Sequence, residues 1–397
     1  MSGVKIRIEQ DANLEQQTSE GSFVFIGSGV QYFKIWIVNL LLSVLTLGIF
    51  SAWAKTRTKR YFYRNTQFDG HGFDYHASPF SILLFRILLI VVAIVLVFVG
   101  ACNWYMQFLV PVFVLLVSPG LIWFWMKFEA EMSSFRGVRF GFICACSAAY
   151  VYTLALPLAF MFCGAMVSVL FAFLQGSVHA REFTLLNSVQ PAIVGICLGM
   201  FFVIPYLHYK LSSYRINSHR FGSDRFKARL ETRFYYSVFF KTWILIALMV
   251  QSAVVVSMLF SVSTDWKSAV MKLVAPPNST YVLVILGVVV FFLLLWLRAF
   301  YLVRCRNHVL NRLQLQSVAS FRSEEKTSRA FYLTLGNLLI FLFSLGFAWP
   351  WIRVRVARYQ VETLNLNLFG NLDQYIAELE SRSVVPVEEV FDLELKI

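Results

Sequence analysis

The densest group of possible metal ligands lies in the stretch FDGHGFDYH (68–76). It holds two aspartates and two histidines, Asp69, His71, Asp74 and His76. Imidazole nitrogens and carboxylate oxygens are common metal ligands. The five-residue spacing of the histidines fits no standard helical metal site, however, so a solvated turn is the better interpretation. We therefore expect no metal and no other cofactor.

Motifs for catalysis are missing from the sequence. It contains no HExxH, no P-loop and no GxSxG, and its six cysteines form no CxxC pair. No Asp or Glu lies inside a long apolar stretch, although proton-coupled carriers usually need such carboxylates as relays. We expect a protein that is not an enzyme.

Two asparagines, Asn39 and Asn337, are the most informative polar residues of the apolar stretches. Side-chain amides in such places commonly hydrogen-bond between helices. The same amides could instead line a polar pathway. Both interpretations stay open, and the second makes these residues candidates for a transport pathway.

The composition indicates which elements must position these groups. Of the 397 residues 58% are hydrophobic and 14% are charged, against about 25% charged in soluble domains, so a water-soluble globule is excluded. The formal charge of +13 agrees better with Lys and Arg gathered in cytoplasmic loops than with nucleic-acid binding. The polar first 22 residues lack the apolar core of a signal peptide.

Stretches without charge mark the candidate membrane spans. The stretch 87–126 is long enough for two helices of about 20 residues, so eight segments result. The stretches are 35–54, 87–126, 140–180, 183–209, 242–264, 273–297 and 330–352.

The two ends of the chain carry one motif, because 32–61 and 330–359 align without a gap at an offset of 298. If each copy crosses the membrane, the basic residues divide 11 to 24 between the two sides. If each copy instead turns back at Gly48 or Gly346, the basic residues divide 3 to 32. Glycine is a suitable residue for ending a helix at such a turn. The positive-inside rule favours the second arrangement, with both termini cytoplasmic.

A basic interfacial helix follows each turn, and such a helix can bind anionic lipid headgroups. Trp53 and Trp351 are suited to hold these helices at the interface. The candidate headgroup residues are Lys55, Arg57, Lys59, Arg60, Arg353, Arg355 and Arg358.

Alternating apolar and polar residues around a turn signal follow the basic helix ends, which predicts short strands or hairpins. Ordinary polar loops are the alternative. Several hairpins together could form a small sheet on one membrane face. The segments are 65–75, 133–142, 215–226, 313–321 and 363–370.

The expected fold class is an all-α polytopic membrane protein with short β-hairpins on the cytoplasmic face. It has about six transmembrane helices and two re-entrant or interfacial elements, or eight spans. The expected parts are a polar segment (1–22), the first terminal repeat (23–79), three transmembrane hairpins (80–328), the second repeat (329–370) and an acidic tail (371–397).

The segment FVFIGSGVQYF (23–33) and the motifs LTLGI, AWAK and DG that follow it resemble the YjgN-like bacterial inner-membrane proteins. The likeness is specific from Phe23 to Tyr75 and extends in hydropathy over nearly the whole chain. The resemblance implies a bacterial cytoplasmic membrane location. Because that family is one of unknown function, it implies no catalytic residues, and it suggests a membrane metallopeptidase as a partner.

Three functions stay open, of which a membrane enzyme is the least favoured because no catalytic constellation is found. The first is a carrier or channel for a small molecule or lipid, favoured by duplicated elements that could meet at a pathway. The second is a membrane scaffold, or a regulator of a partner such as a metallopeptidase. The expected partners are anionic membrane lipids and a membrane protein, without nucleic acid.

Overall fold

A closed barrel of ten antiparallel strands is the centre of the computed structural model, which describes residues 18–102, 105–178, 185–262, 278–316 and 318–382. Side chains 253–286 and most of those in 168–198 are also outside the description. The expected all-α class is therefore wrong. The strands are β1 (Thr18–Phe25), β2 (Thr66–Phe68), β3 (His71–Tyr75), β4 (Ser133–Phe135), β5 (Val138–Phe142), β6 (His219–Phe221), β7 (Asp224–Ala228), β8 (Leu313–Leu315), β9 (Ala319–Ser323) and β10 (Leu364–Phe369).

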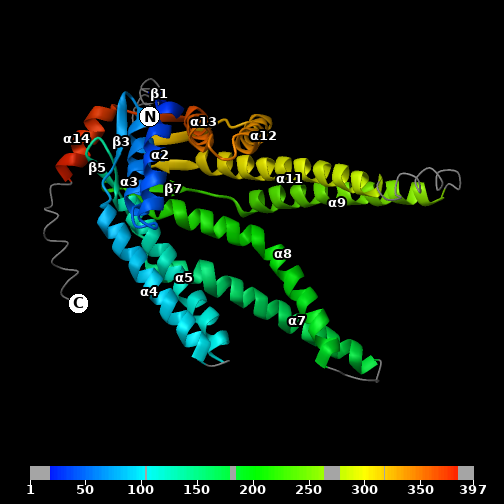
Figure 1. Ribbon diagram of the computed structural model, residues 1–397. Coiled ribbons are helices and arrows are strands. Elements are labelled where there is room, and N and C mark those ends of the chain that lie inside the picture. The colour runs from blue at the N-terminus through cyan, green and yellow to red at the C-terminus, as the bar shows by residue number, and fades with distance from the viewer. Residues whose placement is uncertain (1–17, 103–104, 179–184, 263–277, 317, 383–397) are drawn as a thin grey trace, which may run out of the picture.

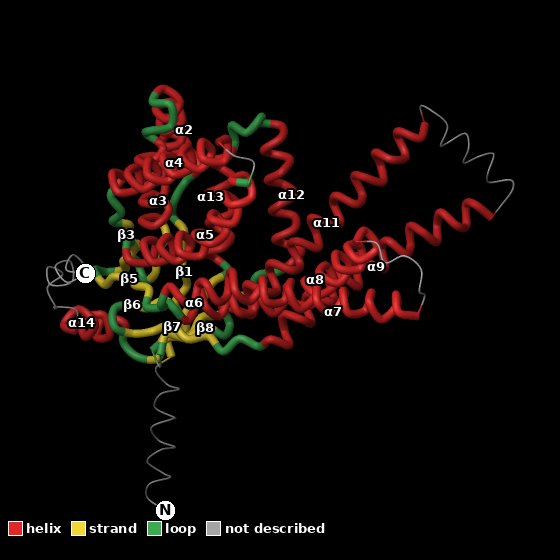
Figure 2. Tube along the Cα trace, turned by 90° about the horizontal axis from the view of Figure 1, so that it is seen from below, coloured by secondary structure: helices red, strands yellow, loops and turns green. Residues whose placement is uncertain are grey.

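Five successive units with the same order of elements make up the barrel and its helices. Each unit begins with a barrel strand, continues through helices and ends with the neighbouring barrel strand. Figures 1 and 2 show these helices projecting away from the strands. They are α2 (Gly29–Leu45) and α3 (Ser51–Asn65); α4 (Pro79–Cys102) and α5 (Met106–Glu131); α6 (Cys146–Tyr150), the π-helical η1 (Val151–Ala155), α7 (Leu156–Val178) and α8 (Leu185–Asn217); α9 (Thr232–Val262) and α11 (Asn278–Leu310); and α12 (Thr327–Phe343) and α13 (Trp349–Glu362).

Tight turns join neighbouring units at the end of the barrel away from the helices. Asp69 and Gly70 have φ of 50° and 73°, and Arg136 and Gly137 have 48° and 83°. Two positive φ values in a two-residue loop match the right-handed twist of the strands that they join. The predicted alternating segments thus form strands, and the polar-loop alternative is wrong for them.

The barrel closes where the two ends of the chain meet. Strand β1 pairs along its first half with β10 and along its second half with β2. The helices of the terminal units pack together as well, since the ring centroids of Phe33 and Trp351 lie 5.0 Å apart. Arg358 Nη2 donates to the Gly27 carbonyl at 3.0 Å. The pairing of β1 with β10 closes the sheet into a barrel, and the contacts between the terminal helices accompany this closure.

Five helices in the described residues are long and apolar enough to cross a membrane, rather than the six expected. The predicted span at 183–209 falls in α8, whose first half has side chains outside the description. Helices α2 and α12 are apolar but shorter, with 17 residues each. The five spans are Pro79–Ala101, Gln107–Glu131, Cys146–Val167, Thr232–Ser252 and Gly287–Leu310.

Helix α14 (Leu372–Arg382) closes the end of the barrel away from the membrane helices (Figure 1). Its apolar face enters the lumen, where Ile376 is 3% exposed and Leu379 is 1% exposed. A polar residue of α14 binds the turn between β4 and β5, because Arg136 Nη1 pairs with Asp373 Oδ1 at 2.7 Å. The acidic tail predicted from the sequence therefore begins with a helix that is part of the barrel core.

Candidate functional site

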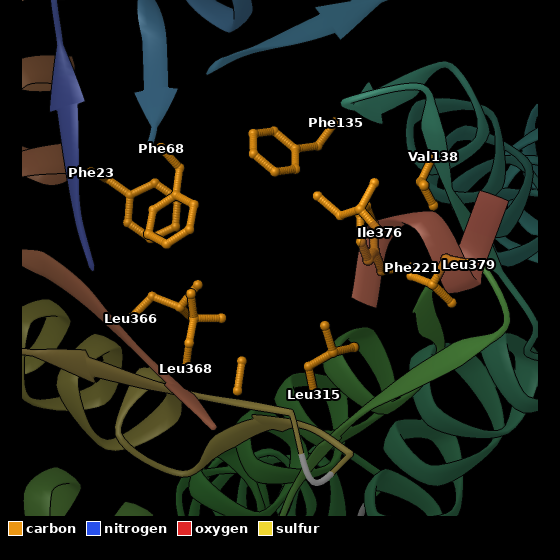
Figure 3. Packing of buried hydrophobic residues seen from close by; sticks show 11 residues of the cluster. Phe23, Phe68, Phe135, Val138, Phe221, Leu315, Leu366, Leu368, Ile376 and Leu379 are labelled. Carbon is orange, nitrogen blue, oxygen red and sulfur yellow. The ribbon is translucent and has the colours of Figure 1, made fainter. Parts of the chain in front are cut away.

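The barrel lumen is lined by a ring of large apolar side chains to which every strand contributes. Figure 3 shows members of this cluster pointing toward a common centre from different strands. From β1 to β10 the ring consists of Phe23, Phe68, Phe73, Phe135, Phe140, Phe221, Phe226, Leu315, Phe321 and Leu366.

The aromatic members of this ring contact one another around the barrel. The centroid of Phe73 lies 4.7 Å from that of Phe135, and Phe140 lies 5.0 Å from Phe221. Aromatic pairs avoid the face-to-face sandwich, and these two pairs are inclined by 36° and 45°. The rings continue to Phe226, whose centroid is 6.3 Å from that of Phe321. The lumen thus has a nearly continuous aromatic wall.

A cavity of about 530 Å³ remains inside this wall. Small-molecule sites in proteins typically have about 300–1,000 Å³ and a mostly apolar lining with a few polar groups. Here the polar groups at the helix end include Thr66, Arg306 and Gln360. Arg306 is held in place, since Nη1 pairs with Glu325 at 3.0 Å and Nη2 donates to the Gln360 carbonyl at 2.8 Å.

Helix α14 covers the opposite end of the lumen and is joined to β7 by a partly buried hydrogen bond. The Tyr375 hydroxyl donates to Oδ2 of Asp224 at 2.7 Å, and Asp224 is 6% exposed. The lumen therefore has helices at both of its ends, while its cavity stays partly open to the surroundings.

A second, basic pocket of about 440 Å³ brings together three of the predicted headgroup residues: Lys55, Lys59 and Arg353. The same pocket includes Asn39, one of the two predicted pathway residues, and Arg86 on α4. The sequence alone could not show that α2, α3, α4 and α13 meet at this point.

The other four predicted headgroup residues have separate surroundings. Arg57 lies over the Phe50 ring at 5.2 Å. Arg60 Nε donates to the Tyr75 carbonyl at 3.1 Å, and Arg358 binds the Gly27 carbonyl. Arg355 reaches α12, where a Cβ added at Gly336 would lie 3.3 Å from Nη1. Arg60 and Arg358 thus have structural partners.

The two predicted asparagines are both buried, Asn39 at 5% exposure and Asn337 at 7%, and in each the amide oxygen has no hydrogen-bond partner. They do not line one described cavity, since the basic pocket includes Asn39 alone. The predicted turns contain Gly48 and Gly346 with φ of 91° and 88°. The chain reverses there, and re-entry into a membrane stays a prediction.

The histidine and aspartate cluster of the first hairpin is held by local contacts. His76 Nε2 lies 2.8 Å from the Ser134 hydroxyl, and Asp74 pairs with Arg64 at 3.0 Å. His71 Nδ1 lies 2.8 Å from the Asp69 carbonyl oxygen. No group of three or more possible metal ligands occurs within the described part of the chain.

The lumen itself was missed by sequence reasoning. Its signal is present in the hairpins, because Phe68 and Phe73 flank one turn as Phe135 and Phe140 flank the next. A phenylalanine on each strand beside the turn indicates that the paired strands share one apolar face. The apolar faces of all five units surround a single lumen only because distant parts of the chain contact one another. A local sequence pattern does not show those contacts.

Apolar helices long enough to cross a membrane, attached to a closed barrel, define an integral membrane protein. The chain belongs to the family described as "Bacterial protein of unknown function (DUF898)", which matches residues 20–393.

Relatives in this family are inner-membrane proteins. The chain is 28% identical over 378 residues to the "Inner membrane protein YjgN" of Escherichia coli O157:H7, covering 90% of this chain and 91% of the relative. It is 30% identical over 176 residues to the protein of that name in Salmonella typhimurium strain LT2, covering 44% and 45%. No solved structure matches the chain.

Proposed function

We propose that this protein is a carrier that holds an apolar or amphipathic molecule, such as a lipid, in the lumen of its barrel. The observation that supports this function is the cavity of about 530 Å³ in the barrel lumen, whose wall is largely phenylalanine and leucine. Each methylene moved from water into such a space gains about 0.8 kcal/mol. The polar groups at the helix end would orient the polar end of the molecule.

The proposed topology places the barrel on the cytoplasmic side of the bacterial inner membrane. The helices of each unit together connect one barrel strand to the neighbouring strand, so the chain returns to one side after each excursion. With the termini on that side, 32 of the 35 basic residues are cytoplasmic. A lumen in this position can exchange its contents with the inner leaflet. The proposed role involves no catalysis.

Binding is tested by extracting the intact protein in a mild detergent and recording a native mass spectrum. Ala319 is 3% exposed and lines the lumen, so Ala319→Phe places a ring inside it. Ser320 follows on β9 and faces the other way, which makes Ser320→Phe the matched control. We expect wild type and Ser320→Phe to retain one apolar or amphipathic molecule, and Ala319→Phe to lose it. Equal retention by Ala319→Phe would contradict lumen binding.

Transport is tested with the molecule that this spectrum identifies. Wild-type protein in vesicles should accelerate its transfer between membranes, and folded Ala319→Phe should not. A stoichiometric protein partner without any lumen ligand would instead favour the scaffold or regulator function.

A further inference from the structure

The basic pocket lies outside the barrel, between α2, α3, α4 and α13. It contains hydroxyl groups and four cationic side chains. Its lining is Trp36, Asn39, Leu40, Ser43, Ser51, Ala54, Lys55, Thr58, Lys59, Arg86 and Arg353. None of these residues is acidic, so the pocket has an excess of positive charge.

Three of the four cations have no carboxylate partner among the described residues. Lys55 Nζ lies 3.5 Å from the centroid of the Trp125 ring, and Arg86 donates to the Ser51 hydroxyl. The guanidinium of Arg353 lies 5.4 Å from the Phe62 ring.

The fourth cation, Lys59, pairs with Glu129, so one negative charge faces four positive ones. Burial and then the nearby Arg86 guanidinium lower the pKa of Lys55. An anion in the pocket would favour the charged form of Lys55 and so oppose this lowering of its pKa.

Asn39 supplies an independent indication of a ligand. Its side chain is 5% exposed and lines the pocket, and its amide oxygen has no donor. Its amide nitrogen lies 3.5 Å from the Ala54 carbonyl oxygen, which is a long hydrogen bond. An unpaired polar atom at such burial costs about 1–3 kcal/mol. A bound group with an O–H could satisfy it.

We propose that this pocket binds a phosphate group with a neighbouring hydroxyl, from the headgroup of an anionic lipid or from free phosphate. The three unpaired cations form charge-assisted hydrogen bonds to the phosphate oxygens, and the hydroxyl donates to Asn39. Arg86 of the pocket belongs to the apolar helix Pro79–Ala101, so the pocket adjoins a helix that is long enough to cross a membrane. This inference does not depend on ligand binding in the lumen.

The test measures binding by calorimetry to the purified full chain in a neutral detergent. The probes are dihexanoyl phosphatidylglycerol, dihexanoyl phosphatidylcholine and sodium phosphate. The pocket variants are Arg86→Gln and Arg353→Gln, with Arg57→Gln as a control that removes the same charge outside the pocket. Asn39→Leu is compared with Asn337→Leu, an equally buried asparagine outside the pocket.

We expect phosphatidylglycerol to bind and phosphatidylcholine to bind at least tenfold more weakly. Each pocket variant and Asn39→Leu should weaken the binding at least tenfold, while Arg57→Gln and Asn337→Leu change it less than twofold. If sodium phosphate binds with the same variant pattern and the lipid does not, the phosphate site stands and free phosphate is its source. No binding of either, or equal losses in Arg57→Gln and Arg86→Gln, would overturn the proposal.

Discussion

Phe62 and Arg353 form a contact between the walls of the two cavities. The guanidinium of Arg353 lies 5.4 Å from the centroid of the Phe62 ring. Phe62 lines the barrel lumen, whereas Arg353 lines the basic pocket. Because these residues belong to α3 and α13, the same contact also joins the first unit of the chain to the last.

This contact should be measurable as a coupling energy. A cation over an aromatic face at an exposed site contributes about 0.5–1 kcal/mol. We expect a double-mutant cycle of Phe62→Leu and Arg353→Gln, measured by the free energy of unfolding in detergent, to give a coupling in that range. Additive effects of the two changes would show that the contact contributes nothing.

Helix α14 should depend on the apolar residues that it inserts into the lumen. Leu379 is 1% exposed, and truncating a buried leucine to alanine costs about 2–5 kcal/mol. Leu379→Ala should therefore accelerate hydrogen exchange of the α14 amides at least about tenfold. The exposed Gln374 of the same helix provides the control Gln374→Ala. Unchanged exchange in Leu379→Ala would mean that α14 is held by its polar contacts alone.

The turn between α2 and α3 should require glycine for its backbone rather than for space. Gly48 has φ of 91°, and a Cβ there would meet nothing within 4 Å. Gly48→Ala should destabilise the protein by about 1–2 kcal/mol, the cost of a left-handed alanine. The matched change Gly287→Ala, in open space on α11, should stabilise it by about 0.5–1 kcal/mol. Equal effects of the two changes on thermal unfolding would refute this explanation.

His219 at the start of β6 should make the barrel sensitive to mild acid. Burial has the largest effect and lowers the pKa of His219 below its usual value of 6.5. The hydrogen bond to the Arg215 carbonyl acts in the opposite direction, and the Arg215 guanidinium lowers the pKa further. The unfolded chain then binds a proton more readily than the folded one. The stabilisation is therefore complete above pH 6.5 and is lost as the pH falls below it.

His219→Gln tests this pH dependence, since glutamine does not titrate. We expect the melting temperature of wild type to fall more steeply than that of His219→Gln between pH 7 and pH 5.5. Parallel curves would show that another group causes the change.

The sequence predicts the local elements and not the way in which they assemble. Period-two alternation is a local property, so the strands around Asp69 and Arg136 could be predicted. Closure depends on β1, which pairs Thr18 with Phe369 and Phe23 with Phe68. Residues 18–22 are polar and fall in the polar segment 1–22, so the sequence does not predict strand β1.

The candidate site divides in the same way. Lys55, Lys59 and Arg353 could be selected as cations near a membrane surface, because charge is visible in the sequence. Their meeting with Asn39 and Arg86 requires four helices from three units to pack together. Predicting the lumen would have required knowledge of the closed barrel and of the insertion of α14. The acidic sequence of α14 indicates a solvated tail instead.

Photo-crosslinking with a palmitic acid that bears a diazirine tests lumen binding most directly. After irradiation of the intact protein in detergent, the labelled peptides are mapped by mass spectrometry. Labels on the strand residues Phe140, Phe226 and Phe321, lost in Ala319→Phe and kept in Ser320→Phe, are the result that we predict. Labels confined to the outer faces of the apolar helices, with the same pattern in both variants, would contradict an apolar binding site in the barrel.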